Sequence, residues 1–169
     1  MRSKLCFTIA LIAAFAAPTF AQSDVPATLL AHLKTSRAFT LKVAEQMPEA
    51  TYDFKLTPPQ MSFAGQMVHL AQSFDEYLSA FSGQKPSLRK PASMNKKDVV
   101  AFVGQSFDSA IARVSKLTAA DLAKTFTGEN GKMTGLELVM AMFDHTTHHR
   151  ASAEMYLRAK GITPAEHQF

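Results

Sequence analysis

The chain has a single cysteine, Cys6, and it lies in the N-terminal segment, so the remaining residues carry no thiol. This excludes disulfides, thiolate metal ligands and a cysteine nucleophile from residues 7–169. Any chemistry must therefore come from histidines, carboxylates, hydroxyls or a bound metal.

Motifs for nucleotides and nucleic acids are also missing. The chain has no glycine-rich phosphate loop, no G-x-S-x-G elbow and no internal repeat. The formal net charge is +4, and the one loose basic stretch, residues 85–97, is typical of a solvated loop. We therefore expect no nucleic-acid partner.

The first residues have the layout of a secretory signal peptide. A short cationic start is followed by an apolar run over residues 5–17 and by a small residue, Ala21. The apolar run is shorter than the roughly 20 residues that span a bilayer, which favours cleavage over an uncleaved anchor. The sequence predicts a signal peptide over residues 1–21, one domain over residues 22–169, and export to the periplasm or the exterior. No membrane association is expected after cleavage.

Four long amphipathic segments and no strand signal predict an all-α fold, a four-helix bundle. In these segments apolar residues recur at spacings of three and four. Ser62 can cap the second helix, and Thr134 with Glu137 forms a capping box before the last. The predicted helices cover residues 26–47, 62–83, 95–114 and 134–160, with a short turn of helix at 118–126.

Three of the six histidines, His145, His148 and His149, fall within five positions. Residues four apart on an α-helix point the same way, so His145 and His149 could hold one metal ion. A helical wheel places His149 inside the apolar face and His145 on its shoulder, whereas His148 falls on the polar side. Two imidazoles on a buried face cost free energy unless they are hydrogen-bonded or metal-bound.

A stable site needs a third ligand, because catalytic zinc commonly has three protein ligands and one position open to water. His69 lies in the middle of the second predicted helix, but the wheel rotates it away from the apolar stripe. Periodicity alone therefore predicts that His69 is exposed. His32, Glu76 and Glu154 are rivals for the third position with no better claim.

Two parts of the chain resemble a known family. The motif DHTTHHR at residues 144–150, with residues 161–164, is similar to the last helix of DinB-family proteins. Residues 48–58 and 62–69 are similar to the family's first connection and second helix. The resemblance implies a four-helix bundle of the DinB type in which three histidines hold a divalent metal: His69, His145 and His149. It is the family, not the periodicity, that selects His69.

The resemblance also implies chemistry. The family includes thiol-dependent S-transferases and a thiol-dependent isomerase, so one hypothesis is a metal-dependent enzyme, S-transferase-like or hydrolase-like. Its partner would be a low-molecular-weight thiol or another small molecule, bound in its thiolate form. The alternatives are a non-catalytic extracytoplasmic metal-binding or stress-related module, and a bundle without metal.

Several points stay open at this stage. Imidazole ligands admit Zn, Ni, Fe or Cu, and Zn, Ni or Fe is expected. Asp144, Glu154 and Tyr156 are candidates to orient a ligand histidine, although ordinary packing explains such residues more often. No catalytic residue is assigned, no organic cofactor is expected, and a homodimer stays open because related bundles often pair.

Overall fold

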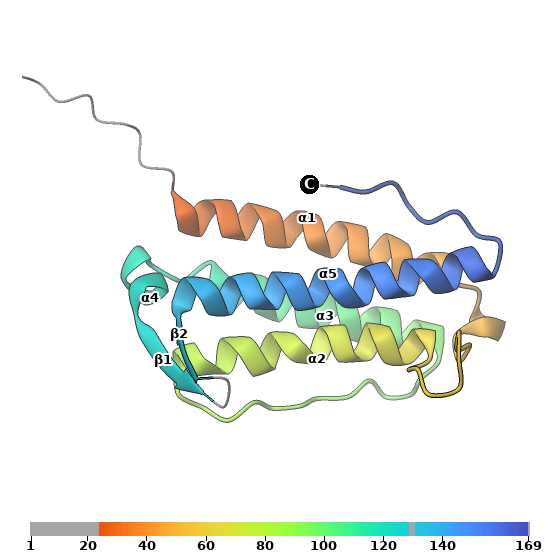
Figure 1. The fold of residues 1–169 in the computed structure, drawn as a ribbon, viewed down its shortest axis with the longest axis horizontal. Coiled ribbons are helices and arrows are strands. Elements are labelled where there is room, and N and C mark those ends of the chain that lie inside the picture. Colours follow the sequence, from red (N-terminus) through yellow and green to blue (C-terminus); the bar gives the residue numbers. More distant parts are fainter. Residues whose placement is uncertain (1–23, 129–130, 169) are drawn as a thin grey trace, which may run out of the picture.

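The computed structural model describes residues 24–128 and 131–168, and the predicted signal peptide lies outside them. Four long helices form a bundle (Figure 1): α1 (Val25–Gln46), α2 (Phe63–Ser82), α3 (Lys96–Val114) and α5 (Gly135–Ala159). The shorter elements are η1 (Glu49–Thr51), α4 (Ala119–Ala123), β1 (Thr125–Gly128) and β2 (Gly131–Thr134). No helix in the described part of the chain is long and apolar enough to cross a membrane.

The helix ends follow the capping chemistry of the sequence. The Ser62 side chain accepts a hydrogen bond from the amide of Gly65 at the start of α2. Thr134 and Glu137 form the predicted capping box, in which each side chain accepts from the other's backbone amide. These local bonds fix where α2 and α5 begin, and so fix the positions of the histidines along both helices.

The prediction of a chain without strands is wrong, because the structure contains two of them. The expected helical turn at residues 118–126 is helical only over α4, after which β1 and β2 form an antiparallel hairpin. Each strand has four residues, too few for an alternating pattern to be read from sequence. The hairpin is held from outside itself, by the Phe126 ring on the Phe81 ring, with centroids 5.0 Å apart.

The direction of the helices requires one long crossover. In Figure 1, α1 and α5 run one way and α2 and α3 run the other. The parallel pair α2 and α3 is joined by residues 83–95, which return along the length of α2. A 20-residue helix is about 30 Å long, and 13 extended residues reach roughly 43 Å, so the connection spans this distance without strain.

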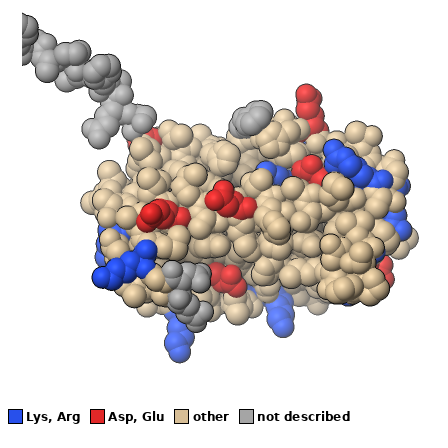
Figure 2. Space-filling view, viewed as in Figure 1, with Lys and Arg blue, Asp and Glu red and all other residues tan. Residues whose placement is uncertain are grey.

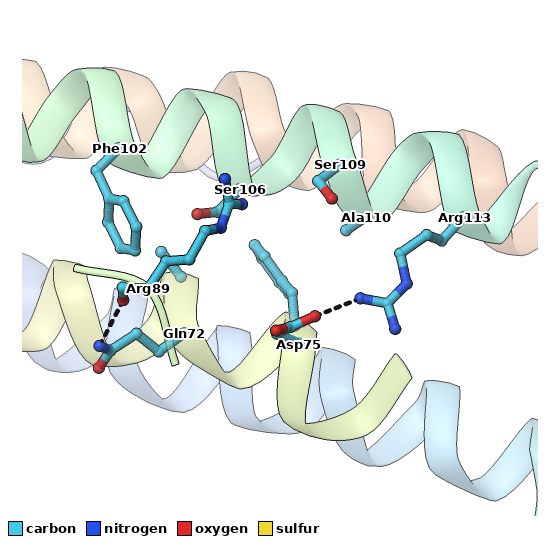
Figure 3. Close-up of a pocket in the computed structure, with 10 residues that line it drawn as sticks. Gln72, Asp75, Arg89, Phe102, Ser106, Ser109, Ala110 and Arg113 are labelled. Atoms are coloured by element: carbon cyan, nitrogen blue, oxygen red, sulfur yellow. Dashed lines mark hydrogen bonds and ion pairs between the residues drawn. The ribbon is translucent and has the colours of Figure 1, made fainter. Parts of the chain in front are cut away.

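Polar contacts fasten this crossover to the bundle (Figure 3). Gln72 donates from Nε2 to the carbonyl of Arg89 at 2.8 Å, and the Ser87 amide donates to Asp75 Oδ2 at 2.5 Å. The other oxygen of Asp75 accepts from Arg113 Nη1 on α3 at 2.6 Å. One carboxylate thus joins α2, α3 and the crossover.

Gly135 joins the hairpin to α5 where space is tightest. Its amide donates to the Lys124 carbonyl at 2.8 Å, and the residue is buried. A Cβ at this position would lie 2.3 Å from the Asp121 carbonyl oxygen, 2.9 Å from Phe81 Cε1 and 3.0 Å from Leu122 Cα. Two of these three atoms belong to the backbone of α4, which cannot turn aside as a side chain does.

Replacing Gly135 by alanine should therefore destabilise the fold. We expect Gly135→Ala to lower the free energy of unfolding by about 1–3 kcal/mol, the usual range for overpacking a tight contact. Urea unfolding followed by circular dichroism measures the change. Gly128→Ala is the matched control, because a Cβ there meets nothing within 4 Å; equal stability of the two variants would contradict the packing argument.

Candidate metal centre

Three histidine rings meet between α2 and α5. The ring centroids of His69, His145 and His149 are 4.4–4.9 Å apart, and one ligand nitrogen from each lies within 4.8 Å of the others. His69 Nε2 and His145 Nε2 are 3.2 Å apart. Within the described residues, this histidine triad is the one group of three or more metal-ligand side chains that converge in this way.

The triad lies in a polar section of the seam between two antiparallel helices. His145 and His149 are one turn apart on α5, and His69 faces them from α2. Gln66 and Ser73 share the face of His69 and are buried at 8% and 0% exposure. The prediction that His69 is exposed is wrong, because α2 packs against both α3 and α5 and therefore buries two faces, whereas the wheel assumed a single stripe.

The spacing of the nitrogens suits a metal ion. Two imidazole nitrogens bound to a tetrahedral Zn²⁺ at about 2.0–2.1 Å would be roughly 3.3 Å apart. The observed separation of 3.2 Å between the Nε2 atoms of His69 and His145 is close to this value. A hydrogen bond between two neutral rings gives a similar distance, so the geometry fits metal binding and also describes a metal-free resting arrangement.

Gln66 fixes the orientation of His149. Its Oε1 lies 2.6 Å from His149 Nδ1, and because an amide oxygen only accepts, Nδ1 carries the proton. The lone pair of His149 is then on Nε2, as a ligand requires. Gln66 Nε2 in turn donates to the Tyr156 hydroxyl at 3.4 Å, and that hydroxyl donates to the Met61 carbonyl at 2.6 Å.

These contacts show what the sequence reasoning missed. Tyr156 was a candidate to orient a ligand histidine, and it does so at one remove, through Gln66. The sequence analysis assigns no role to Gln66, although this residue precedes His69 by three positions and so shares its face of α2. His145 has no equivalent support, since its Nδ1 is buried without a hydrogen-bond partner among the described residues.

The other candidates lie outside the triad. His148 is exposed, as the wheel predicted, and its ring packs edge-on against His149 with centroids 4.9 Å apart. His32 is exposed on α1 and contacts the ring of Phe143. Glu154 lies 3.9 Å from Arg158 on the same helix, and Glu76 is exposed. None of them belongs to the converging group.

The surroundings of His145 and His149 favour the neutral form of both rings. Burial, followed by the charges of His145, His69 and His148, lowers the pKa of His149 to about 4. Burial also lowers the pKa of His145, with contributions from His69 and His148. Protons therefore do not compete for these nitrogens near pH 7, and the lone pairs are available to a metal.

The rest of the visible surface offers no strong field of one sign. On the face that carries α5, acidic side chains are scattered across the middle and basic ones lie mostly toward the edges (Figure 2). This distribution agrees with the absence of a basic cluster in the sequence.

Comparison with known proteins identifies a family and two solved structures to which this chain is similar. A family model described as the DinB superfamily matches residues 32–153. A DinB-like protein from Bacillus subtilis has 20% identity and a TM-score of 0.72, over 83% of this chain and 96% of its own. One from Bacillus cereus has 16% identity and a TM-score of 0.71, over 83% and 95%. No curated protein matches the chain.

Removing the Gln66 amide should weaken metal binding without removing a ligand. We expect Gln66→Leu to reduce the affinity for Zn²⁺ or Co²⁺ by about 10–100-fold, the usual effect of losing the hydrogen bond behind a ligating histidine. Competition with a chromophoric chelator measures it. The control is Gln72→Leu, which loses one hydrogen bond on the same helix away from the triad; an equal loss of affinity in both variants would count against the role of Gln66.

The lowered pKa of His149 predicts how stability depends on pH in the metal-free chain. The unfolded chain takes up this proton near the ordinary pKa of 6.5, and the folded chain only near about 4. Between these values the unfolded state binds more protons, so the free energy of unfolding should fall as the pH drops from 6.5 toward 4.

Urea unfolding in EDTA at pH 7.0 and 5.5 tests this dependence. His149→Gln, which cannot titrate, should show a smaller fall in stability between the two pH values than the wild type does. His32→Gln removes an exposed histidine elsewhere and serves as the control. An identical pH dependence in the wild type and His149→Gln would contradict the assignment.

Proposed function

The chain belongs to the DinB superfamily, and on that premise we propose that it binds one divalent metal ion through His69, His145 and His149. The observation that carries the proposal is the convergence of three ring nitrogens from two helices, with one ring held in the ligand tautomer by Gln66. Zn, Ni or Fe is the expected ion, since all three accept imidazole ligands.

We further propose that the bound metal serves a thiol. Three protein ligands leave room for an exogenous one, and a divalent ion there would favour the thiolate form of a low-molecular-weight thiol. The resemblance to a family with thiol-dependent S-transferases supports this function.

The non-catalytic alternative rests on the same observation. A site of three histidines could equally store or sense a metal. Either function would operate outside the cytoplasm if residues 1–21 act as the export signal that the sequence predicts. The two functions differ in whether the metal-loaded chain binds and activates a thiol.

Metal analysis of the untagged chain, residues 22–169, tests the proposal. We expect about one equivalent of metal by mass spectrometry after loading with Zn²⁺ or Ni²⁺, and less than about a tenth of that in His149→Ala, because a two-histidine site loses most of its affinity. His148→Ala, one position earlier and exposed, should retain the wild-type content. Failure of the wild type to take up metal would overturn the proposal.

With metal bound, the thiol step can be read separately. The Co²⁺-loaded chain should develop a thiolate-to-metal absorption band on addition of 2-mercaptoethanol, and should accelerate the reaction of that thiol with a chromogenic electrophile. A band without acceleration, or neither, favours the non-catalytic module.

A further inference from the structure

A cleft of about 630 Å³ lies between the hairpin and the seam of α2 and α5. Its volume is within the range of roughly 300–1,000 Å³ typical of small-molecule sites. The walls come from α2, the crossover, the two strands and the start of α5; we call it the hairpin cleft. The residues that define its chemistry are Glu76, Tyr77, Ala80, Phe126, Met133 and Leu138.

The hairpin cleft lies next to the histidine triad along one seam, with Tyr77 between them. Tyr77 lines the cleft, and its ring lies edge-on to His145, with centroids 6.0 Å apart. Tyr77 follows His69 by eight residues and Leu138 precedes His145 by seven, which places the cleft about 10–12 Å from the triad along both helices. This distance is within the length of a single extended small molecule.

The lining selects by polarity and charge. Most of the named wall residues are apolar, and Glu76 is the one residue charged at neutral pH among all those that line the cleft. A second carboxylate, Asp144, is exposed and directly precedes His145 on α5. Lys124 contacts the outer wall, with its Nζ 5.2 Å from the Phe126 ring centre, but it does not line the cleft.

We propose that the hairpin cleft binds the apolar, ring-bearing end of a small molecule whose other end, a thiol, reaches the metal at the histidine triad. Glu76 makes the cleft favour a neutral or cationic group over a carboxylate there. The inference rests on the proposed metal function and adds to it the class of ligand: an aryl or alkyl thiol about 10 Å long, rather than a compact or anionic one.

The cavity between α2 and α3 is too small to be a binding site for such a ligand. The cavity in Figure 3, beside Asp75 and Arg113, has a volume of about 20 Å³, room for one water. It lies on the opposite side of α2, where the polar groups already bind one another and fasten the crossover.

Isothermal titration of the untagged, Zn²⁺-loaded chain tests the proposal, after metal content has been measured. The probes are 2-mercaptoethanol, hexane-1-thiol and 6-phenylhexane-1-thiol, which share the thiol and differ in reach and in the ring. We expect the phenyl probe to bind at least about tenfold more tightly than hexane-1-thiol, because the ring buries apolar surface that the shorter probe cannot reach.

Two variants fill the cleft from different walls. Ala80→Phe on α2 and Thr127→Trp on β1 should each abolish the advantage of the phenyl probe while leaving metal content and 2-mercaptoethanol affinity unchanged. Ala112→Phe, on the exposed side of α3, is the matched control for added bulk. Thermal unfolding identifies any variant that fails to fold, and the second wall then supplies the result.

Charge selection has its own measurement. Adding a para-carboxylate to the phenyl probe should weaken binding at least threefold, and Glu76→Gln should recover most of that loss. Glu154→Gln, paired with Arg158 elsewhere on α5, should not.

The two proposals fail differently. A chain that takes up no metal overturns the proposed function, and this proposal with it, at the first step. A second outcome separates the two proposals: the chain binds metal and 2-mercaptoethanol, but it binds hexane-1-thiol and 6-phenylhexane-1-thiol with equal affinity, and the Ala80→Phe and Thr127→Trp variants do not change either affinity. That result keeps the metal function and overturns the hairpin cleft as a ligand site.

Discussion

The packing of α2 against α5 is the constraint on which the rest of the structure depends. Most helix seams are apolar, but this one contains three imidazoles, Gln66 and Ser73 between well-packed residues such as Met67 and Met142. Each buried polar group costs free energy unless it finds a partner. Ser73 bonds back to the Leu70 carbonyl and Gln66 bonds across to His149, yet His145 Nδ1 finds none among the described residues. The seam is therefore incompletely satisfied, with His145 Nδ1 as the buried polar atom that lacks a partner among the described residues.

The elements around the seam hold it in register. The hairpin and α4 close one end, where Gly135 lies against the α4 backbone with no room for a side chain. At the other end the Tyr156 hydroxyl binds the Met61 carbonyl and ties the last turns of α5 to the segment before α2. Arg150, buried at 5% exposure, reaches across to Ser36 on α1 and stacks over Phe39. A shift of α5 by one residue would break all of these contacts, which explains why His145 and His149 meet His69 in one arrangement.

Much of this could be predicted from the sequence, and the limits have physical causes. The long helices follow from periodicity and caps, and the pairing of His145 with His149 and the exclusion of His148 follow from helical geometry alone. His69 was different, because a wheel reports one preferred face, whereas α2 has two buried faces and the second is polar. Only the family resemblance selected it. Gln66 could not be assigned before its partner's position was known. The hairpin was missed because its stability comes from Phe81 and Gly135, which lie outside it.

The packing of α2 against α5 also explains how the proposed metal site and the hairpin cleft can each select its own ligand. The three histidines lie on two long helices, and the packing of these helices against each other fixes the positions of the ring nitrogens. The cleft shares those helices through Glu76, Tyr77, Ala80 and Leu138, and its outer wall is a hairpin of two four-residue strands in which no residue is fully buried. Under the proposed function, side-chain changes on that wall would alter what fits beside the triad without moving the rings. Under the proposed function, the bundle thus confines the geometry of metal binding to two long helices and leaves the choice of ligand to a short hairpin at its end.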